Sequence, residues 1–290
     1  MLVDVEWLKE RVDDERTVVF DCRFDLADKG AGIRSYLSGH IPGAYYLDLE
    51  KDLSSPVSIH GGRHPLPNLG DLADKLATAG VESGVTVVVY DAGEGMAPRA
   101  WWLIRHMGHE DVRVLDGGFN EWCHAGLPTS DELPAPRFRN FELRQRTEDT
   151  VTLPEVERLA AGEGDAVLLD ARLVERFRGD VEPLDPAKGH IPGAVCAPWN
   201  ECFQSPGVWK NANQLRDHFA RVLSKKNRDV EAQIVAYCGS GVTACVNLFA
   251  LEMAGFRFAK LYPGSFSDWA SYPDHAVATG DGDGAAHAGS

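Results

Sequence analysis

One cysteine in the sequence stands in a setting that suits nucleophilic chemistry. Cys238 follows an apolar, β-branched run and opens the loop Cys238-Gly239-Ser240-Gly241-Val242-Thr243, beyond which a helical pattern begins. A loop at the carboxyl end of a parallel strand lies in the usual ligand crevice of an open α/β sheet. Its two glycines let several backbone N–H groups face one point, and the helix N-terminus adds a partial positive charge. We therefore expect the loop to stabilise a thiolate, or another sulfur anion, on Cys238.

Most cysteines in a chain of this kind are buried apolar side chains, and that is the expectation for the others. The six cysteines, at positions 22, 123, 196, 202, 238 and 245, form no Cys-x-x-Cys pair and no zinc-like spacing with histidine. Neither a metal site nor a disulfide framework is predicted. Cys245 falls on the expected helix after the loop, where packing is a better interpretation than a redox partnership with Cys238.

Composition narrows the classes of function. A net charge of −15 disfavours nucleic acid as a partner, because its phosphates must be met by Lys and Arg. No apolar run approaches the ~20 residues that a membrane-spanning helix needs, so no membrane partner is expected. Residues 1–11 lack the basic start and apolar stretch of a secretory signal. These features predict a cytoplasmic protein.

An internal repeat organises the chain. The segment Gly-His-Ile-Pro-Gly-Ala at 39–44 returns at 189–194. An Asp-x-Arg motif precedes each copy, and each half closes with a similar aromatic motif, at 115–122 and 263–269. Duplication of a whole domain explains this spacing. The predicted parts are an N-terminal domain at 1–128, a Pro-rich and charged linker at 129–150, a C-terminal domain at 151–278 and a disordered tail at 279–290.

Each half alternates short apolar strands with helical stretches. This pattern is typical of an α/β fold in which a parallel sheet is flanked by helices on both faces. The expected helices are 5–12, 69–79, 98–107, 153–161, 214–223 and 243–254.

These motifs together resemble the tandem rhodanese family, over about residues 5–273. The loop at Cys238 is similar to the active loop of its 3-mercaptopyruvate sulfurtransferase branch. The resemblance implies two rhodanese-like domains and a sulfurtransferase that carries a sulfane sulfur as a Cys238 persulfide, in a two-step transfer without a metal or organic cofactor. Asp91 stands at the corresponding place in the first half, and a carboxylate cannot accept sulfane sulfur. The N-terminal domain is therefore expected to be non-catalytic.

The resemblance also implies roles for particular residues. Cys238 and Ser240 would be catalytic, within an active-site loop completed by Gly239, Gly241, Val242 and Thr243. Arg176 matches the family's substrate-binding arginine and would grip the donor's carboxylate. His64 and Glu50 match the histidine and the acid that are thought to act with the loop serine. Structural roles are expected for the repeated motif residues, which are His40, His190, Asp21, Arg23, Asp170, Arg172, Trp122 and Trp269.

Two small anions are candidates for the sulfur donor, 3-mercaptopyruvate and thiosulfate. The neutral segment Gly239-Ser240-Gly241 favours 3-mercaptopyruvate, because sulfurtransferases that prefer thiosulfate usually carry cations in this loop. The mercaptopyruvate branch has a second arginine nine residues after Arg176, however, and Asp185 stands there. This segment is closer to the thiosulfate branch. We hypothesise that Arg63 or Arg99 supplies the missing charge. The expected acceptor is cyanide in the assay and a thiol or thioredoxin-like protein in the cell, and the expected state is a monomer.

Two rival classes remain at this point. A non-catalytic sulfur carrier would form the persulfide but turn over small donors poorly. A thiol phosphatase of the same fold needs a loop arginine that grips phosphate. Ala244 is the sixth residue beyond Cys238, and the loop contains no arginine, so phosphate chemistry is disfavoured.

Overall fold

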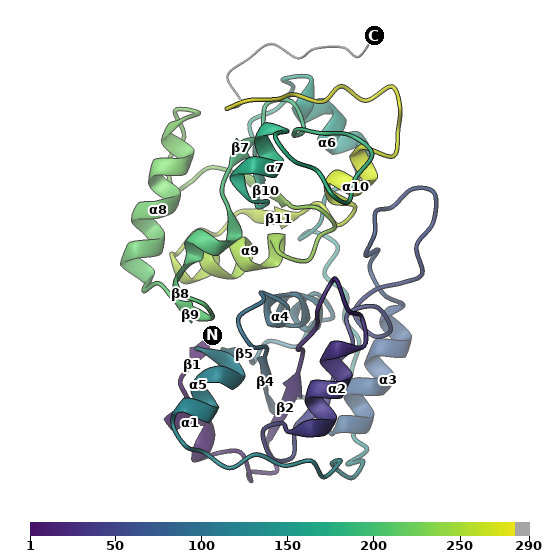
Figure 1. The fold of residues 1–290 in the computed structure, drawn as a ribbon, viewed down its shortest axis with the longest axis vertical. Helices are drawn as coiled ribbons and strands as arrows, with labels where there is room; N and C mark the ends of the chain where they lie inside the picture. The colour runs from purple at the N-terminus through teal and green to yellow at the C-terminus, as the bar shows by residue number, and fades with distance from the viewer. Residues whose placement is uncertain (282–290) are drawn as a thin grey trace. The chain divides into compact units, whose positions relative to one another are not determined.

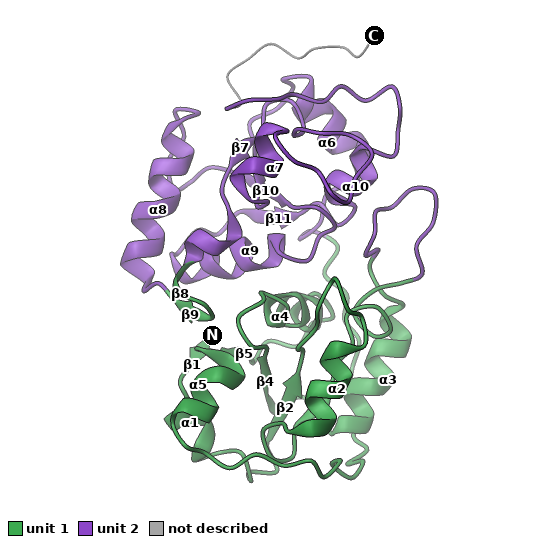
Figure 2. Ribbon diagram, viewed as in Figure 1, with its two compact units in different colours: residues 1–55, 66–147, 203–209 green, residues 56–65, 148–202, 210–290 purple. Residues whose placement is uncertain are grey.

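The computed structural model describes residues 1–281 and divides into two compact units, coloured separately in Figure 2. Unit 1 comprises Met1–Ser55, Leu66–Thr147 and Phe203–Trp209. Unit 2 comprises Pro56–Pro65, Glu148–Cys202 and the chain from Lys210 onward. Each unit has its own sheet and its own hydrophobic core, as expected for a chain built from two domains.

Unit 1 is built on a five-stranded parallel sheet with the strand order β1-β5-β4-β2-β3. The strands are β1 (Leu2–Val3), β2 (Thr17–Asp21), β3 (Tyr45–Tyr46), β4 (Thr86–Tyr90) and β5 (Val112–Leu115). The helices are α1 (Val5–Lys9), α2 (Ala31–Ser38), α3 (Leu69–Ala79), α4 (Ala97–His106) and α5 (Gly118–His124), all labelled in Figure 1. All five residues of β2 are buried, because helices cover both faces of a parallel sheet.

Unit 2 repeats this plan with a four-stranded parallel sheet of order β11-β10-β6-β7. Its strands are β6 (Val167–Asp170), β7 (Val195–Cys196), β10 (Ile234–Tyr237) and β11 (Ala259–Leu261). Its helices are α6 (Leu153–Ala160), α7 (Val174–Arg178), the 3₁₀ turn η1 (Trp199–Cys202), α8 (Ala212–Ser224), α9 (Ala244–Met253) and α10 (Ser265–Trp269). Both β6 and β10 are buried along their whole length. The α/β fold class predicted from the sequence is confirmed in both units.

The residues that the repeat singled out are structural. Arg23 pairs with Asp21 at 2.6 Å, and Arg172 pairs with Asp170 at the same distance. Both histidines of the repeated motif are fully buried, His40 stacked on Tyr36 and His190 stacked on Phe177. Trp122 and Trp269 are buried in the cores of their units. The prediction that these residues hold the scaffold is confirmed.

Two short segments are exchanged between the units: each packs in one unit although the chain on both sides of it belongs to the other. Residues 56–65 pack in unit 2, where Gly61 N–H donates to Asp268 Oδ1 at 2.7 Å and Arg63 N–H donates to Ser267 Oγ at 3.0 Å. The hairpin of β8 (Phe203–Ser205) and β9 (Val208–Trp209) packs in unit 1. Figure 2 shows both by colour. No motif in the sequence indicates this exchange.

Five of the six expected helices are present with ends within two residues of the prediction. The first is shorter, since α1 ends at Lys9 rather than at residue 12. Four helices were not predicted, α2, α5, α7 and α10, because all are short and three begin at a glycine-containing turn or include one.

Gly280 and Asp281, at the start of the predicted tail, bond to Arg178, and residues 282–290 lie outside the described part. Within residues 1–281 no helix is long and apolar enough to cross a membrane.

Candidate active site

Cys238 lies at the carboxyl end of β10, and α9 begins six residues later at Ala244. Its side chain is buried, with 2% of its surface exposed. The backbone N–H of Gly241 points at the thiol, with the nitrogen 3.2 Å from Sγ. Gly241 has φ +79°, and a β-carbon there would lie 2.5 Å from the carbonyl oxygen of Pro263. The glycine therefore permits both the turn and the close approach that aim this N–H group.

Residues 265–267, in the aromatic motif that closes the second repeat, form hydrogen bonds with the backbone of the Cys238 loop. Ser265 Oγ accepts from the backbone N–H of Cys238 at 3.2 Å. The N–H of Phe266 donates to the carbonyl of Cys238, and the N–H of Ser267 donates to that of Gly239. Ser265 has φ +56°, a left-handed conformation that is unfavourable for a residue with a side chain. Comparing the repeats would have revealed it, because Gly118 with φ +55° is the equivalent residue in the first half.

Two arginines lie against the residue that follows the cysteine. A β-carbon built on Gly239 would lie 2.7 Å from Arg63 Nη2 and 3.3 Å from Arg176 Nη1. Burial, and then the positive charge of Arg176, lower the pKa of the Arg63 guanidinium. Arg63 comes from the exchanged segment 56–65 and Arg176 from α7, so both belong to unit 2. This edge of the Cys238 loop therefore carries two guanidinium groups that could meet an anionic donor.

Both arginines are also held by buried acids. Arg176 is gripped by Glu182, with contacts of 2.7 and 3.0 Å from Nη2 and 3.1 Å from Nε. Asp185 Oδ2 lies 3.0 Å from Arg176 Nη2, and Asp185 Oδ1 pairs with Arg63 Nη1. The side chains of Glu182 and Asp185 are 0% and 2% exposed. In the sequence Asp185 is recognisable only as a departure from the resemblance, and no motif marks Glu182.

His64 and Ser240 form a hydrogen-bonded pair. Nδ1 of His64 lies 2.7 Å from Oγ of Ser240, and both side chains are buried. The structure thus brings His64 to the loop, as the resemblance implied. Glu50 belongs to unit 1, where its carboxylate forms an ion pair with Lys29 at 2.6 Å. Arg99, the alternative to Arg63, is fully buried on α4 of unit 1 and donates to the carbonyl of Leu53 at 3.2 Å.

The equivalent loop in unit 1 is an internal comparison. Asp91 takes the place of Cys238, and its carboxylate accepts from the backbone N–H groups of Gly93, Met96 and Ala97 at 2.8, 2.6 and 2.8 Å. The loop geometry of this fold therefore gathers N–H groups around an anion at this position. Burial raises the pKa of Asp91 despite these bonds, and burial followed by the charge of Asp91 raises the pKa of Glu94 to about 7.

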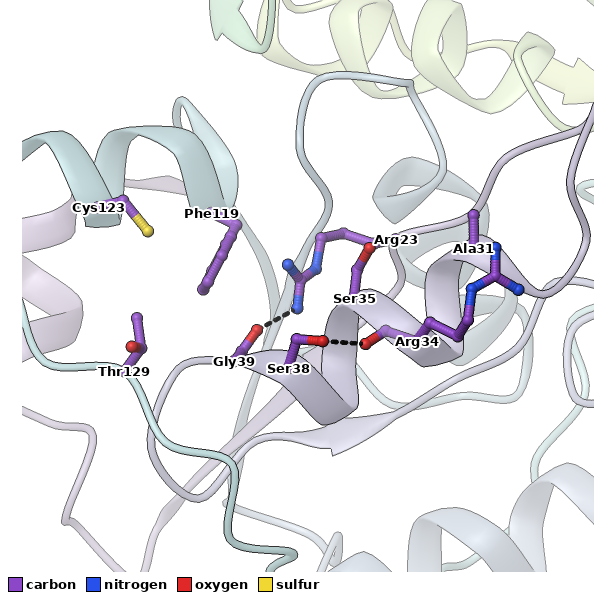
Figure 3. A pocket seen from close by; sticks show the side chains of 9 residues that line it. All are labelled: Arg23, Ala31, Arg34, Ser35, Ser38, Gly39, Phe119, Cys123 and Thr129. Carbon is purple, nitrogen blue, oxygen red and sulfur yellow. Dashed lines mark hydrogen bonds between the residues drawn. The ribbon is translucent and has the colours of Figure 1, made fainter.

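A separate hollow in unit 1, with a volume of about 540 Å³, contains none of the predicted site residues (Figure 3). Arg23 on its wall is already committed to Asp21 and to the carbonyl of Gly39, 2.7 Å away. The other lining residues are Ala31, Arg34, Ser35, Ser38, Phe119, Cys123 and Thr129. Within residues 1–281 no group of three His, Cys, Asp or Glu side chains is arranged to hold a metal ion.

Comparison with known proteins agrees with this geometry. The family described as Rhodanese-like domain matches residues 4–125 and again 152–272. The chain is 45% identical to the "Probable 3-mercaptopyruvate sulfurtransferase" of Pseudomonas aeruginosa, over 97% of this chain and 98% of that one. It is 38% identical to the "Putative thiosulfate sulfurtransferase SseB" of Mycobacterium tuberculosis, over 90% of each. The crystal structure of SseA from Escherichia coli, described as a 3-mercaptopyruvate sulfotransferase with the rhodanese fold, has a TM-score of 0.79 and 34% identity, covering 92% of this chain and 98% of that one.

The fold and the two matches define a protein of tandem rhodanese-like domains, and the chain belongs to the rhodanese family. It is a sulfurtransferase.

Proposed function

We propose that this sulfurtransferase takes sulfur from 3-mercaptopyruvate and carries it as a persulfide on Cys238. The observation that carries the proposal is the position of two guanidinium groups, those of Arg63 and Arg176, directly against Gly239 beside the thiol. A donor whose carboxylate meets this edge would present its sulfur to Cys238. Arginine suits this task because its planar fork matches a carboxylate. Arg63 would stand in for the second arginine that the sequence lacks at position 185.

The first step transfers sulfur without any outside oxidant or reductant. The Cys238 thiolate attacks the donor's sulfur, forming an S–S bond while the donor's C–S bond breaks. The electron pair of that bond stays on carbon as the enolate of pyruvate. The thiol proton of the donor is delivered to that carbon, and the His64–Ser240 pair would relay it. The products are pyruvate and a Cys238 persulfide anion, which the N–H group of Gly241 would stabilise.

The second step returns the enzyme to its starting state. A nucleophile, cyanide in the assay, attacks the outer sulfur of the persulfide. Thiocyanate leaves and the Cys238 thiolate is regenerated, which gives ping-pong kinetics. In the cell the proposed acceptor is a thiol or a thioredoxin-like protein. All six cysteines are free thiols, which suits a reducing compartment such as the cytoplasm. The proposed state is a monomer.

Thiosulfate is the second candidate donor. Asp185 and the similarity to the Mycobacterium tuberculosis relative favour it. The two donors are separated by measuring kcat/KM for cyanide-dependent thiocyanate formation in parallel. We expect 3-mercaptopyruvate to exceed thiosulfate by more than about tenfold, or ~1.4 kcal/mol in the transition state. The opposite ranking would make thiosulfate the donor.

The role of Cys238 has its own test. Cys238→Ser should abolish turnover and the mass gain of one sulfur atom after incubation with donor, with an unchanged circular dichroism spectrum. Cys123→Ser, at an exposed position of unit 1, is the matched control and should keep both. Undiminished turnover in Cys238→Ser would refute the assignment. A persulfide that forms but is not turned over with small donors would instead favour a non-catalytic sulfur carrier.

A further inference from the structure

Arg23 keeps one unpaired nitrogen at the hollow in unit 1. Its contacts with Asp21 and with the carbonyl of Gly39 use Nε and Nη2. Nη1 forms no hydrogen bond or ion pair within the part of the chain that the structure describes. The side chain is only 8% exposed, and a shielded donor without a partner is unfavourable unless another group meets it. Figure 3 shows this guanidinium group on the wall of the hollow, with one terminal nitrogen bonded to Gly39.

The second repeat contains an equivalent arginine in the same setting. Arg172 pairs with Asp170 and donates from Nη2 to the carbonyl of Gly189 at 2.6 Å. Its guanidinium carbon lies 3.8 Å from the centre of a phenylalanine ring, against 4.0 Å for Arg23. The difference between the two arginines is the partner of Nη1, which in unit 2 is Oε2 of the buried Glu182, 3.3 Å away. A guanidinium already paired with an aspartate thus still binds a second carboxylate in this fold.

The acid is missing from unit 1 because the chain there is shorter. Tyr36 and Phe177 are equivalent, since each stacks on the histidine of its repeat and has its carbonyl oxygen 2.8 or 2.7 Å from Nδ1 of that ring. One residue earlier, Ser35 therefore takes the place of Arg176. Helix α2 ends at the residue before the repeated motif, so residues 180–188 have no counterpart in the first half. A short side chain and a missing segment account for the hollow.

The other lining groups of the hollow suit a small organic anion. Arg34 supplies a second positive charge from α2, where its exposed side chain pairs with Asp28 at 2.5 Å. The hydroxyls of Ser35 and Thr129 can donate hydrogen bonds, and Phe119 offers an apolar surface. The volume of about 540 Å³ is in the usual range for small-molecule sites.

We propose that this hollow is a binding site for a small organic carboxylate. The carboxylate group occupies the place that Glu182 takes in unit 2. It accepts from Nη1 of Arg23 and pairs with Arg34, as Glu182 pairs with Arg172 and Arg176. The site lies in unit 1 and uses none of the residues proposed for sulfur transfer, so the two proposals stand or fall separately.

Cys123 can report whether the hollow is filled, because it lines the hollow and is exposed. The rate at which N-ethylmaleimide modifies Cys123 in the wild-type chain is followed by mass spectrometry of its peptide while succinate is added. We expect succinate to slow the reaction saturably, by about fivefold or more, because an occupant of the hollow shields the thiol. Succinamide, a neutral analogue, and sodium chloride at matched ionic strength should leave the rate unchanged.

These probes also give the results that contradict the proposal. A rate that succinate does not change, or that succinamide or sodium chloride lowers equally, would overturn it. Protection by inorganic phosphate equal to that by succinate would overturn the assignment to carboxylates.

Arg34→Gln tests the second positive charge without touching the scaffold pair of Arg23. We expect the succinate concentration that gives half protection to rise about tenfold, because one charge-assisted contact is lost. Arg144→Gln is the matched control, since Arg144 is also an exposed arginine of unit 1 paired with an acid, Glu142, but is not part of the hollow. It should leave protection unchanged, and equal losses in the two variants would overturn the role of Arg34.

Ser35→Glu places a carboxylate of the chain itself beside Nη1 of Arg23. This variant should slow modification of Cys123 in the absence of succinate and should remove the further effect of succinate. Ser35→Gln, of the same size but neutral, should still respond to succinate. Protection by succinate that persists unchanged in both Ser35→Glu and Arg34→Gln would place the anion elsewhere and would overturn the proposal.

Discussion

His64 and Ser240 are 176 residues apart in the chain, yet Nδ1 of the histidine lies 2.7 Å from Oγ of the serine. Both side chains are buried, at 6% and 7% exposure, so the pair is shielded from competing water. The exchanged segment 56–65 makes this contact possible, since it carries His64 into unit 2. A histidine and a hydroxyl in this relationship can pass a proton between them.

If the pair relays the donor's proton as a unit, its two members should not contribute independently. His64→Ala and Ser240→Ala are each expected to lower kcat/KM for 3-mercaptopyruvate by about 10²-fold, the lower range for general acid–base catalysis. The double variant should be little worse than either single one, because the second change removes a group that is already disconnected. Steady-state kinetics of the three variants form the cycle. Losses that multiply in the double variant would mean that the residues act separately.

Gly239 is expected to be required for donor binding more than for folding. The nearest atoms to a β-carbon at this position are the ends of two flexible side chains, Arg63 and Arg176. Gly239→Ala should displace these guanidinium groups and raise KM for the donor by about tenfold, while the melting temperature changes little. Kinetics together with a thermal melt check this. An unchanged KM would indicate that the arginines do not contact the donor.

Gly241 and Gly193 share a φ of +79° but differ in their surroundings. Nothing lies within 4 Å of a β-carbon at Gly193, whereas the Pro263 carbonyl oxygen lies 2.5 Å from one at Gly241. Gly193→Ala should therefore cost only the backbone strain, about 1 kcal/mol of unfolding free energy. Gly241→Ala should cost at least ~1–2 kcal/mol more and should also move the N–H group that faces Cys238. Urea unfolding of both variants provides the comparison, and equal losses would mean that the Pro263 carbonyl does not constrain position 241.

The stability of unit 1 should depend on pH through Glu94. Its pKa is about 7 in the folded protein, because of burial first and of the Asp91 carboxylate second, and 4.5 is its ordinary value. Between these values the folded state holds a proton that the unfolded state has lost. The free energy of unfolding therefore falls as the pH rises from about 4.5 to about 7, by up to ~3 kcal/mol, and the loss persists above pH 7.

Glu94→Gln removes this titration and keeps an oxygen that can accept from Ala92 N–H, as Glu94 does at 2.7 Å. The variant should be more stable than the wild type at pH 8 and similar to it at pH 5. Denaturant unfolding at the two pH values tests the expectation. A wild-type advantage at pH 8 would show that the charged carboxylate is stabilising there.

The sequence by itself determined the duplication, the α/β class and the identity of the loop that carries Cys238. These features depend on local chemistry: strand and helix periodicity, and glycines where the chain must turn sharply, as at Gly241. The sequence also showed that Asp91 takes the place of Cys238 in the first half, because equivalent positions in a repeat can be compared directly. Short helices such as α7 and α10 escaped prediction, since a single turn leaves little periodicity to detect.

Only the tertiary structure decided which distant side chains surround the loop. Arg63 and Asp185 are 122 residues apart, and their pairing depends on the exchange of segment 56–65 into unit 2. The same exchange placed His64 beside Ser240, whereas Glu50, a few residues earlier in the chain, remained in unit 1 with Lys29. A sequence motif fixes backbone turns within a few residues. The meeting of long, flexible charged side chains depends instead on which segments of the chain, however distant in sequence, pack into the same unit.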